Sequence, residues 1–136
     1  MMAILKKACL LIFLSLVLSG CSFDKDYIIL FNKDPITQDN YKIDYIRFEA
    51  NKPIYYAFLT TKYFEFDLIR VQVVKTSDKT NILGYSVAYA KDFIINRNKQ
   101  YFTDYIILRS KGHYVMQIFY HTNLNAPLVM RDFWVE

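Results

Sequence analysis

Large and small side chains alternate along residues 83–90, LGYSVAYA. Leu83, Tyr85, Val87 and Tyr89 share one parity, and the residues between them are Gly, Ser or Ala. A period of two places all the large side chains on one face of a β-strand. This alternation constrains the fold more than any other feature of the chain, and it predicts a strand with one apolar face.

Other runs predict strands by the same reasoning, because they are rich in β-branched and aromatic residues. Clusters of turn residues separate them, and no helical period is evident after the N-terminal segment. Short strands at such spacing are typical of antiparallel sandwiches, so we expect an all-β chain with a single antiparallel β-sandwich. The runs are 27–31, 54–61, 104–109, 113–121 and 128–136, and the turns are 50–53, 76–81, 96–100, 110–113 and 122–127.

The apolar parity changes within residues 64–76, FEFDLIRVQVVKT. Phe64 and Phe66 share one parity, whereas Val71 and Val73 have the other. A change of parity means that the apolar face of the chain switches sides. It predicts either a β-bulge or a crossing from one sheet to the other near residues 68 and 69.

The N-terminal segment has the order of an export signal. Lys6 and Lys7 precede an apolar run at 8–18 that only Ser15 interrupts. A transmembrane helix needs about 20 apolar residues, so this run is too short for a permanent span.

The residues that end this run, Leu18-Ser19-Gly20-Cys21, resemble the lipobox of bacterial lipoprotein precursors. The resemblance implies a diacylglyceryl group on the Cys21 thiol, cleavage between Gly20 and Cys21, and acylation of the new amino group. It divides the chain into a signal peptide at 1–20, a lipidated cysteine and tether at 21–26, and a β-sandwich domain at 27–136. The fold is then an all-β domain preceded by a cleaved signal helix. The competing interpretation is an ordinary secretory signal followed by an unmodified cysteine.

Cysteine usage favours the lipid anchor. The only other cysteine, Cys9, falls inside the segment that would be removed, so no internal disulfide remains. Two or three acyl chains anchor a protein stably to a membrane. Ser22 follows the lipidation site, which by resemblance implies sorting to the outer membrane rather than the inner one in hosts that use that rule.

The tether is short. Residues 22–26 reach about 17 Å when fully extended, which is less than one bilayer thickness. If a first strand begins at Tyr27, the domain must lie against the membrane surface. Alternatively, residues 27–40 extend the linker; we favour the strand because YIILF is strongly apolar.

The charge balance gives no support to nucleic-acid binding. The full chain has 17 basic and 13 acidic residues, and removal of Lys6 and Lys7 lowers the net charge from +4 to +2. No run of Lys or Arg is present, so we expect no nucleic-acid partner.

The segment DYIILRSKGHYVMQIFY resembles the E–F corner of immunoglobulin-like domains. In such domains a Tyr at the start of strand F donates a hydrogen bond to nearby backbone. Gly112 and Tyr114 would have these structural roles here. The chain departs from that family because Ser110 replaces an Asp, and because no cysteine pair or early central Trp is present. Any β-meander could also place a Gly and a Tyr in this way.

Candidate catalytic residues are few. His113 and His121 share parity on one predicted strand, but eight residues separate them by about 27 Å, too far for one metal ion. Glu65 and Asp67 are spaced about 7 Å apart, and we interpret them as the solvent side of an amphipathic strand. We therefore expect no metal site here.

A nucleophile motif and a glycine-rich phosphate loop are also missing from the sequence. We expect no cofactor and no enzymatic activity.

Aromatic residues are the remaining candidates for binding. Tyr55 and Tyr56 occupy opposite faces of one strand, and Trp134 follows Phe133 near the C-terminus. Exposed Tyr and Trp suit contacts with proteins, sugars or the bilayer interface, so Tyr55, Tyr56 and Trp134 form the predicted interaction surface. The predicted function is a membrane-anchored cell-envelope lipoprotein that acts through a protein partner or in envelope assembly. The alternatives are a carrier of a lipid or other apolar ligand, and an envelope hydrolase.

Overall fold

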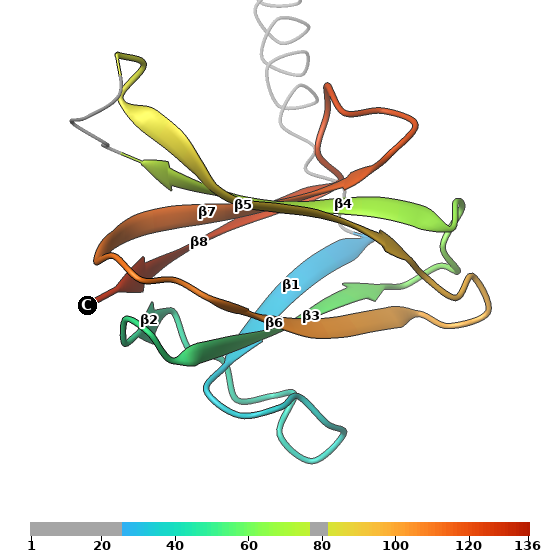
Figure 1. Cartoon of the computed structure of the whole chain (residues 1–136). Coiled ribbons are helices and arrows are strands. Elements are labelled where there is room, and N and C mark those ends of the chain that lie inside the picture. The colour runs from blue at the N-terminus through green and yellow to red at the C-terminus, as the bar shows by residue number, and fades with distance from the viewer. Residues whose placement is uncertain (1–25, 77–81) are drawn as a thin grey trace, which may run out of the picture.

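The chain folds into two β-sheets packed face to face, as the computed structural model shows (Figure 1). The structure describes residues 26–76 and 82–136. The smaller sheet has the strand order β1-β3-β6, and the larger has the order β2-β8-β7-β4-β5. The strands are β1 (Tyr27–Asn32), β2 (Arg47–Phe48), β3 (Pro53–Thr60), β4 (Leu68–Thr76), β5 (Tyr85–Ile94), β6 (Tyr101–Ile107), β7 (Gly112–Tyr120) and β8 (Val129–Val135).

The predicted all-β sandwich is confirmed. The chain passes repeatedly between the sheets, and three strands of one sheet face the β8-β7-β4-β5 ladder of the other, as in immunoglobulin-like domains. One pairing departs from the antiparallel expectation, because the two-residue strand β2 runs parallel to β8. Within the described ranges, no helix is long and apolar enough to cross a membrane. The predicted signal peptide lies outside the described residues, as do Gly20 and Cys21 of the predicted lipidation and cleavage site.

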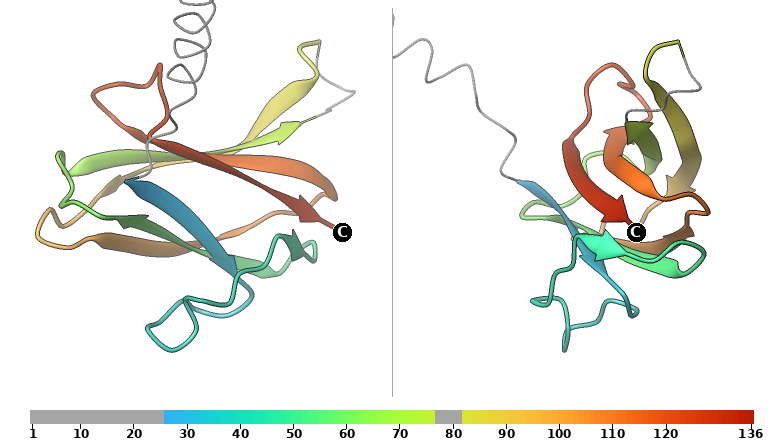
Figure 2. Two further views of the ribbon diagram at one scale, coloured as in Figure 1. Left: turned by 180° about the vertical axis from the view of Figure 1, so that it is seen from behind. Right: turned by 90° about the vertical axis from the view of Figure 1, so that its left-hand side faces the viewer.

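The first strand begins at Tyr27, as the apolar run predicts, and pairs with β3. After Asn32 the chain leaves the sheet, and residues 33–46 form a long connection to β2. Both views of Figure 2 show this cyan segment below the smaller sheet. Residues 27–40 are therefore partly strand and partly connection.

Large side chains fill the space between the sheets. Aromatic rings dominate the end near β2, where Phe31 lies 4.9 Å from Phe133 and 6.1 Å from Phe48, measured between ring centroids. Burial of each such ring contributes about 1.5 to 3 kcal/mol to folding. The largest fully buried side chains are Tyr56, Tyr114, Phe31, Phe58, Phe133, Ile54, Ile69, Met116, Ile118, Val71 and Val73.

The predicted single face of residues 83–90 is wrong. A β-bulge lies between β4 and β5, where Val73 pairs with Tyr89 but Val74 pairs with Val87. The bulge adds one residue to β5 between Val87 and Tyr89, so residues with the same parity on its two sides point to opposite faces of the sheet. Consequently Tyr89 points toward the other sheet, whereas Tyr85 and Val87 are exposed on the outside.

The parity change near residue 68 marks a crossing between sheets. Residues 61–67 connect β3 of the smaller sheet to β4 of the larger, and β4 begins at Leu68. Glu65 and Asp67 therefore lie on a connection, not on the solvent side of a strand as predicted. The connection is fixed by the amide of Glu65, which donates to the Tyr120 hydroxyl at 2.9 Å.

Tyr114 occupies the corner between β6 and β7. Its hydroxyl donates to the Ser110 carbonyl oxygen at 2.6 Å, which is the contact expected of a tyrosine corner. Gly112 begins β7 with φ at +153°, a conformation that other residues rarely adopt. A Cβ atom there would lie 2.9 Å from Cε of Lys75.

Candidate functional site

The outward side of the smaller sheet carries apolar and aromatic side chains where a soluble sheet usually carries polar ones. The strand register arranges these side chains in rows, such as Ile28, Leu59 and Tyr101 across β1, β3 and β6. Thr103 is polar, and so is the buried Asn32, which has the same outward parity because it pairs with Tyr55. We call this surface the outer apolar face; it consists of Ile28, Leu30, Tyr55, Ala57, Leu59, Tyr101, Thr103, Tyr105 and Ile107.

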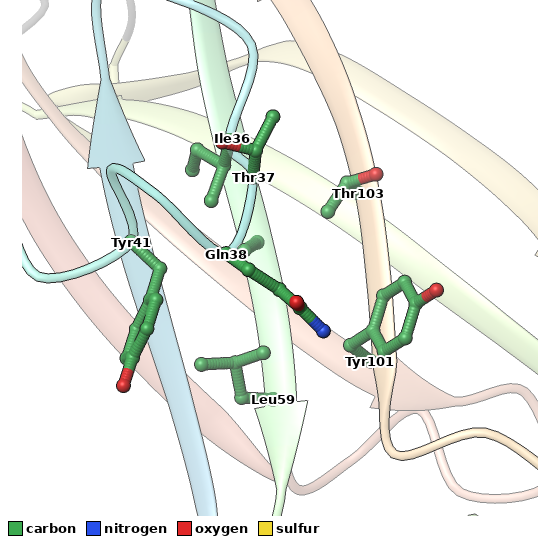
Figure 3. Close-up of a pocket in the computed structure, with 8 residues that line it drawn as sticks. Ile36, Thr37, Gln38, Tyr41, Leu59, Tyr101 and Thr103 are labelled. Carbon is green, nitrogen blue, oxygen red and sulfur yellow. The ribbon is translucent and has the colours of Figure 1, made fainter.

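One half of the outer apolar face is roofed. Residues 36–41 of the β1–β2 connection fold over it and leave a pocket of about 350 Å³. Ala57 lies beneath this segment and is buried although it points outward. Figure 3 shows Tyr41 and Tyr101 on opposite sides of the pocket, with Gln38 extending between them.

The pocket combines an apolar floor with a few polar groups. Leu59 and Ala57 supply methyl groups from β3, whereas Thr37, Gln38 and Thr103 can donate or accept hydrogen bonds. This combination suits an apolar group that is oriented by one or two hydrogen bonds. The volume is close to the lower end of the range of about 300 to 1,000 Å³ found for small-molecule sites.

The roof is held by its own turn. Asn40 accepts a hydrogen bond from the Thr37 amide at 2.7 Å and donates to the Pro35 carbonyl at 2.9 Å. The amide of Tyr41 adds a backbone bond to the Thr37 carbonyl at 3.1 Å. The position of Tyr41 above the sheet is therefore determined by local hydrogen bonds.

An ion pair ties the far end of the same connection to the sandwich. Arg131 on β8 donates from Nη1 to Asp44 Oδ1 and to the Ile29 carbonyl, each at 2.8 Å. Asp44 Oδ1 also accepts the Phe31 amide at 3.1 Å. The pair thus links the connection, β1 and β8.

The other half of the outer apolar face is open. Tyr55 and Tyr105 form a cross-strand pair with ring centroids 5.7 Å apart. Tyr105 and the neighbouring Ile107 are exposed. Tyrosine in such a position presents a large, rigid contact area to a partner.

The free edges of β5 and β6 lie across from each other, where Phe93 and Phe102 are 4.9 Å apart between centroids. Asp104 on β6 pairs in register with Tyr56 and points between the sheets. Burial raises the pKa of the Tyr56 hydroxyl, and the nearby carboxylate of Asp104 raises it further. Burial and Asp104 also raise the pKa of Tyr89. Both phenols therefore lose their protons only at a higher pH than an ordinary tyrosine. An inward-pointing acidic residue such as Asp104 discourages pairing of the β6 edge with another chain.

The predicted interaction surface is wrong in part. Tyr56 has no exposed surface and belongs to the core, because the inward parity of β3 includes it. Tyr55 does lie on the outer apolar face. Trp134 lies on the other sheet, where Arg47 packs over its ring at 5.2 Å and His113 lies 4.7 Å away. The structure therefore does not bring the three residues together.

Sequence reasoning missed Tyr41, Leu59, Tyr101 and Tyr105. A signal for three of them was present, since Leu59, Tyr101 and Tyr105 have the outward parity of their strands. The pocket itself had no linear signal because its walls come from segments far apart in the chain.

The two histidines lie at strand ends and bind carboxylates. His113 Nε2 lies 3.0 Å from Asp132, and its Nδ1 lies 2.6 Å from the Thr76 hydroxyl. His121 Nε2 lies 3.5 Å from Asp92. In the part of the chain that the structure describes, no three His, Cys, Asp or Glu side chains are grouped closely enough to hold a metal ion.

Comparisons with known proteins add one structural likeness. No protein-family model matches this chain, and no curated protein matches it in sequence. Among solved structures it is similar to the soluble domain of PmoD from Methylocystis sp. ATCC 49242 (Rockwell), with a TM-score of 0.51 and 15% identity. The similarity covers 85% of this chain and 95% of that one. At this identity the likeness shows a shared fold alone.

Proposed function

We propose that this chain is a bacterial cell-envelope lipoprotein, anchored through Cys21, whose β-sandwich binds a protein partner without catalysis. The observation that carries the binding role is the outer apolar face, where Tyr101, Tyr105 and Ile107 remain exposed beside a preformed pocket. Exposed aromatic side chains around a pocket are typical of protein-binding hot spots.

The partner that fits this surface is a protein with an apolar side chain projecting from a flat segment. The pocket holds one or two such side chains, and the open Tyr55–Tyr105 pair offers a flat surface beside it. Thr103 and Gln38 can hydrogen-bond to the backbone of the bound segment.

Carriage of an apolar ligand is a second candidate, favoured by the apolar floor of the pocket. The space between the sheets is filled by large side chains, so the pocket on the outside is where a ligand would enter. The pocket volume of about 350 Å³ lies near the lower end of the range of about 300 to 1,000 Å³ for small-molecule sites, so the pocket suits a single small apolar group better than a long lipid. We therefore favour the protein partner.

Site-specific photocrosslinking in intact cells tests the proposal. A photoreactive amino acid replaces Tyr105 in the full-length protein, and a matched variant carries it at Tyr85, which is exposed on the other sheet. We expect one discrete protein adduct from position 105 and none from position 85. Leu59→Asp places a charge in the pocket floor and should abolish the adduct, whereas equal adducts at both positions would reject a specific face.

A lipid adduct at position 105, in place of a protein adduct, would instead establish the carrier. The two outcomes are separated by the mass of the adduct. In either case the Leu59→Asp variant reports whether the pocket is part of the site, provided that its circular dichroism spectrum matches that of the wild type.

A further inference from the structure

Three connections gather at the end of the sandwich where the tether joins β1. Backbone hydrogen bonds fix where each connection begins. The Thr61 amide donates to the Asp26 carbonyl at 2.9 Å, the Ile95 amide to the Asp67 carbonyl at 2.7 Å, and the His121 amide to the Leu68 carbonyl at 3.0 Å. We call this surface the tether end. It consists of Asp26, residues 61–67, Ile94, residues 95–100 and residues 121–128. In Figure 1 the connections at 61–67 and 95–100 lie on the right, and the connection at 121–128 rises above the larger sheet.

Apolar side chains project from the tether end into solvent. Tyr63 is 65% exposed and Ile94 is 84% exposed. Leu124 on the β7–β8 connection is also exposed, and Phe66 is exposed while its ring contacts Tyr120 at 5.2 Å between centroids. Residues from separate parts of the chain thus present apolar groups on one end.

Basic side chains stand among these apolar groups. Lys62 pairs with Asp26 at 2.7 Å, Lys99 lies 5.4 Å from the Tyr101 ring centroid, and Arg97 donates to the Phe64 carbonyl at 3.4 Å. Long basic side chains and tyrosines are favourable at the depth of the lipid headgroups, because each combines an apolar part with a polar end.

The formal charges at the tether end balance. It contains three basic and three acidic residues, so its formal net charge is zero. The basic residues are Lys62, Arg97 and Lys99, and the acidic residues are Asp26, Glu65 and Asp67. Affinity for a membrane would therefore come from the apolar side chains and not from attraction to anionic lipids.

We propose that the tether end rests on the bilayer surface, with Tyr63, Ile94 and Leu124 among the lipid headgroups. This inference rests on the proposed lipid anchor, because residues 22–26 reach only about 17 Å and so hold the start of β1 near the membrane. The domain then stands with its strands rising from the bilayer. The outer apolar face is left open at the side for the protein partner.

The single tryptophan lies at the opposite end of the domain. Val129 of β8 pairs with Ile118 near the tether end, and Trp134 is five residues further along the strand. Five residues of strand span about 17 Å, so Trp134 is held well above the membrane in this orientation.

Quenching by brominated lipids tests the orientation. The lipidated protein, processed from the full-length precursor, is placed in phosphatidylcholine vesicles with or without brominated acyl chains. A tryptophan replaces Tyr63 in a Trp134→Phe background, and the matched control has Tyr85→Trp in the same background. We expect brominated lipid to lower the emission of the Tyr63→Trp protein about two-fold, because interfacial aromatic rings lie close to the acyl chains. Native Trp134 and the Tyr85→Trp control should keep their emission.

Two results would overturn the inference, and they differ in what they imply. If the protein co-floats with the vesicles but the Tyr63→Trp emission is unquenched, the orientation is wrong while the anchor stands. If the protein does not co-float, the lipid anchor fails as well. A Leu124→Trp variant in the same background repeats the test from a second connection, so the result does not depend on the folding of one variant.

Discussion

The Tyr114 hydroxyl donates a 2.6 Å hydrogen bond to the Ser110 carbonyl oxygen across the β6–β7 corner. Since its only proton is used there, the Ser110 hydroxyl at 2.8 Å must donate to the Tyr114 oxygen, and Lys75 donates to that serine at 3.2 Å. The corner is therefore closed by a chain of hydrogen bonds around a buried phenol.

Replacement of this phenol should weaken the fold. Tyr114→Phe removes the hydroxyl that satisfies the Ser110 carbonyl, so we expect the free energy of unfolding to fall by about 1 to 3 kcal/mol. Urea denaturation measures the loss. The control is Tyr105→Phe, whose exposed hydroxyl should be worth less than about 0.5 kcal/mol. Equal effects of the two substitutions would show that the corner is not a stabilising element.

The Tyr56 hydroxyl should make the protein sensitive to alkaline pH. It is buried and, among the described residues, has no hydrogen-bond partner. Burial raises its pKa in the folded state, so below the unfolded-state pKa of about 10 this group causes no change of stability with pH. Above that pH the unfolded chain releases the proton and the folded chain retains it. Stability must then fall with rising pH, by about 1.4 kcal/mol per pH unit for one proton.

Tyr56→Phe removes this proton and tests the assignment. Its free energy of unfolding should equal or exceed that of the wild type at neutral pH, because no hydrogen bond is lost. Between pH 10 and 11 the variant should lose stability less steeply than the wild type. Identical slopes in denaturation curves would mean that the hydroxyl ionises in the folded state.

The Asp44–Arg131 pair should hold the far end of the connection whose residues 36–41 roof the pocket. Asp44→Ala removes the acceptor for Arg131 and for the Phe31 amide. We expect the free energy of unfolding to fall by about 1 to 2 kcal/mol. This value lies between those for exposed ion pairs and for buried hydrogen bonds to charged groups. Hydrogen exchange at the Phe31 and Tyr45 amides should accelerate. Asp39→Ala, on the same connection, should change neither quantity.

Asp92 should titrate below the usual range. The Arg70 guanidinium donates two hydrogen bonds to it, at 2.8 and 3.2 Å, and lowers the pKa of that carboxyl from its ordinary 3.8. The stabilisation is therefore present above the unfolded-state pKa and is lost as pH falls through the folded-state pKa.

Carbon-13 NMR of the Asp92 carboxyl measures this directly. Arg70→Met should raise its pKa toward the ordinary value. Arg70→Lys should give an intermediate value, because an ammonium keeps the charge but cannot reproduce the two-pronged geometry of the guanidinium. An unchanged pKa in Arg70→Met would show that Arg70 is not the cause.

The sequence predicted the parts of the fold that depend on local periodicity. The run at Tyr27 became β1. The resemblance of residues 104–120 to an E–F corner predicted the backbone contact that Tyr114 makes with Ser110. Such patterns are visible because each inward residue of a strand meets the same core.

The features that were missed depend on other strands or on loops. The bulge at Val73 and Val74 reverses the faces of β5 without any Gly or Pro to mark it. Ala57 points outward but is buried, because residues 36–41 cover it. Tyr55 and Tyr56 both belong to the predicted interaction surface, although their opposite parity puts Tyr55 outside and Tyr56 in the core. When adjacent residues of opposite parity are both aromatic, the sequence pattern does not predict which of them faces the second sheet.

The intact mass of the protein extracted from membranes of its native host tests the central claim most directly, with Cys21→Ser as the comparison. The account predicts a chain that starts at Cys21 and is heavier by two or three acyl chains, and it predicts that the Cys21→Ser protein lacks this species. An unmodified, soluble chain would contradict the lipid anchor and, with it, the placement of the domain on the membrane.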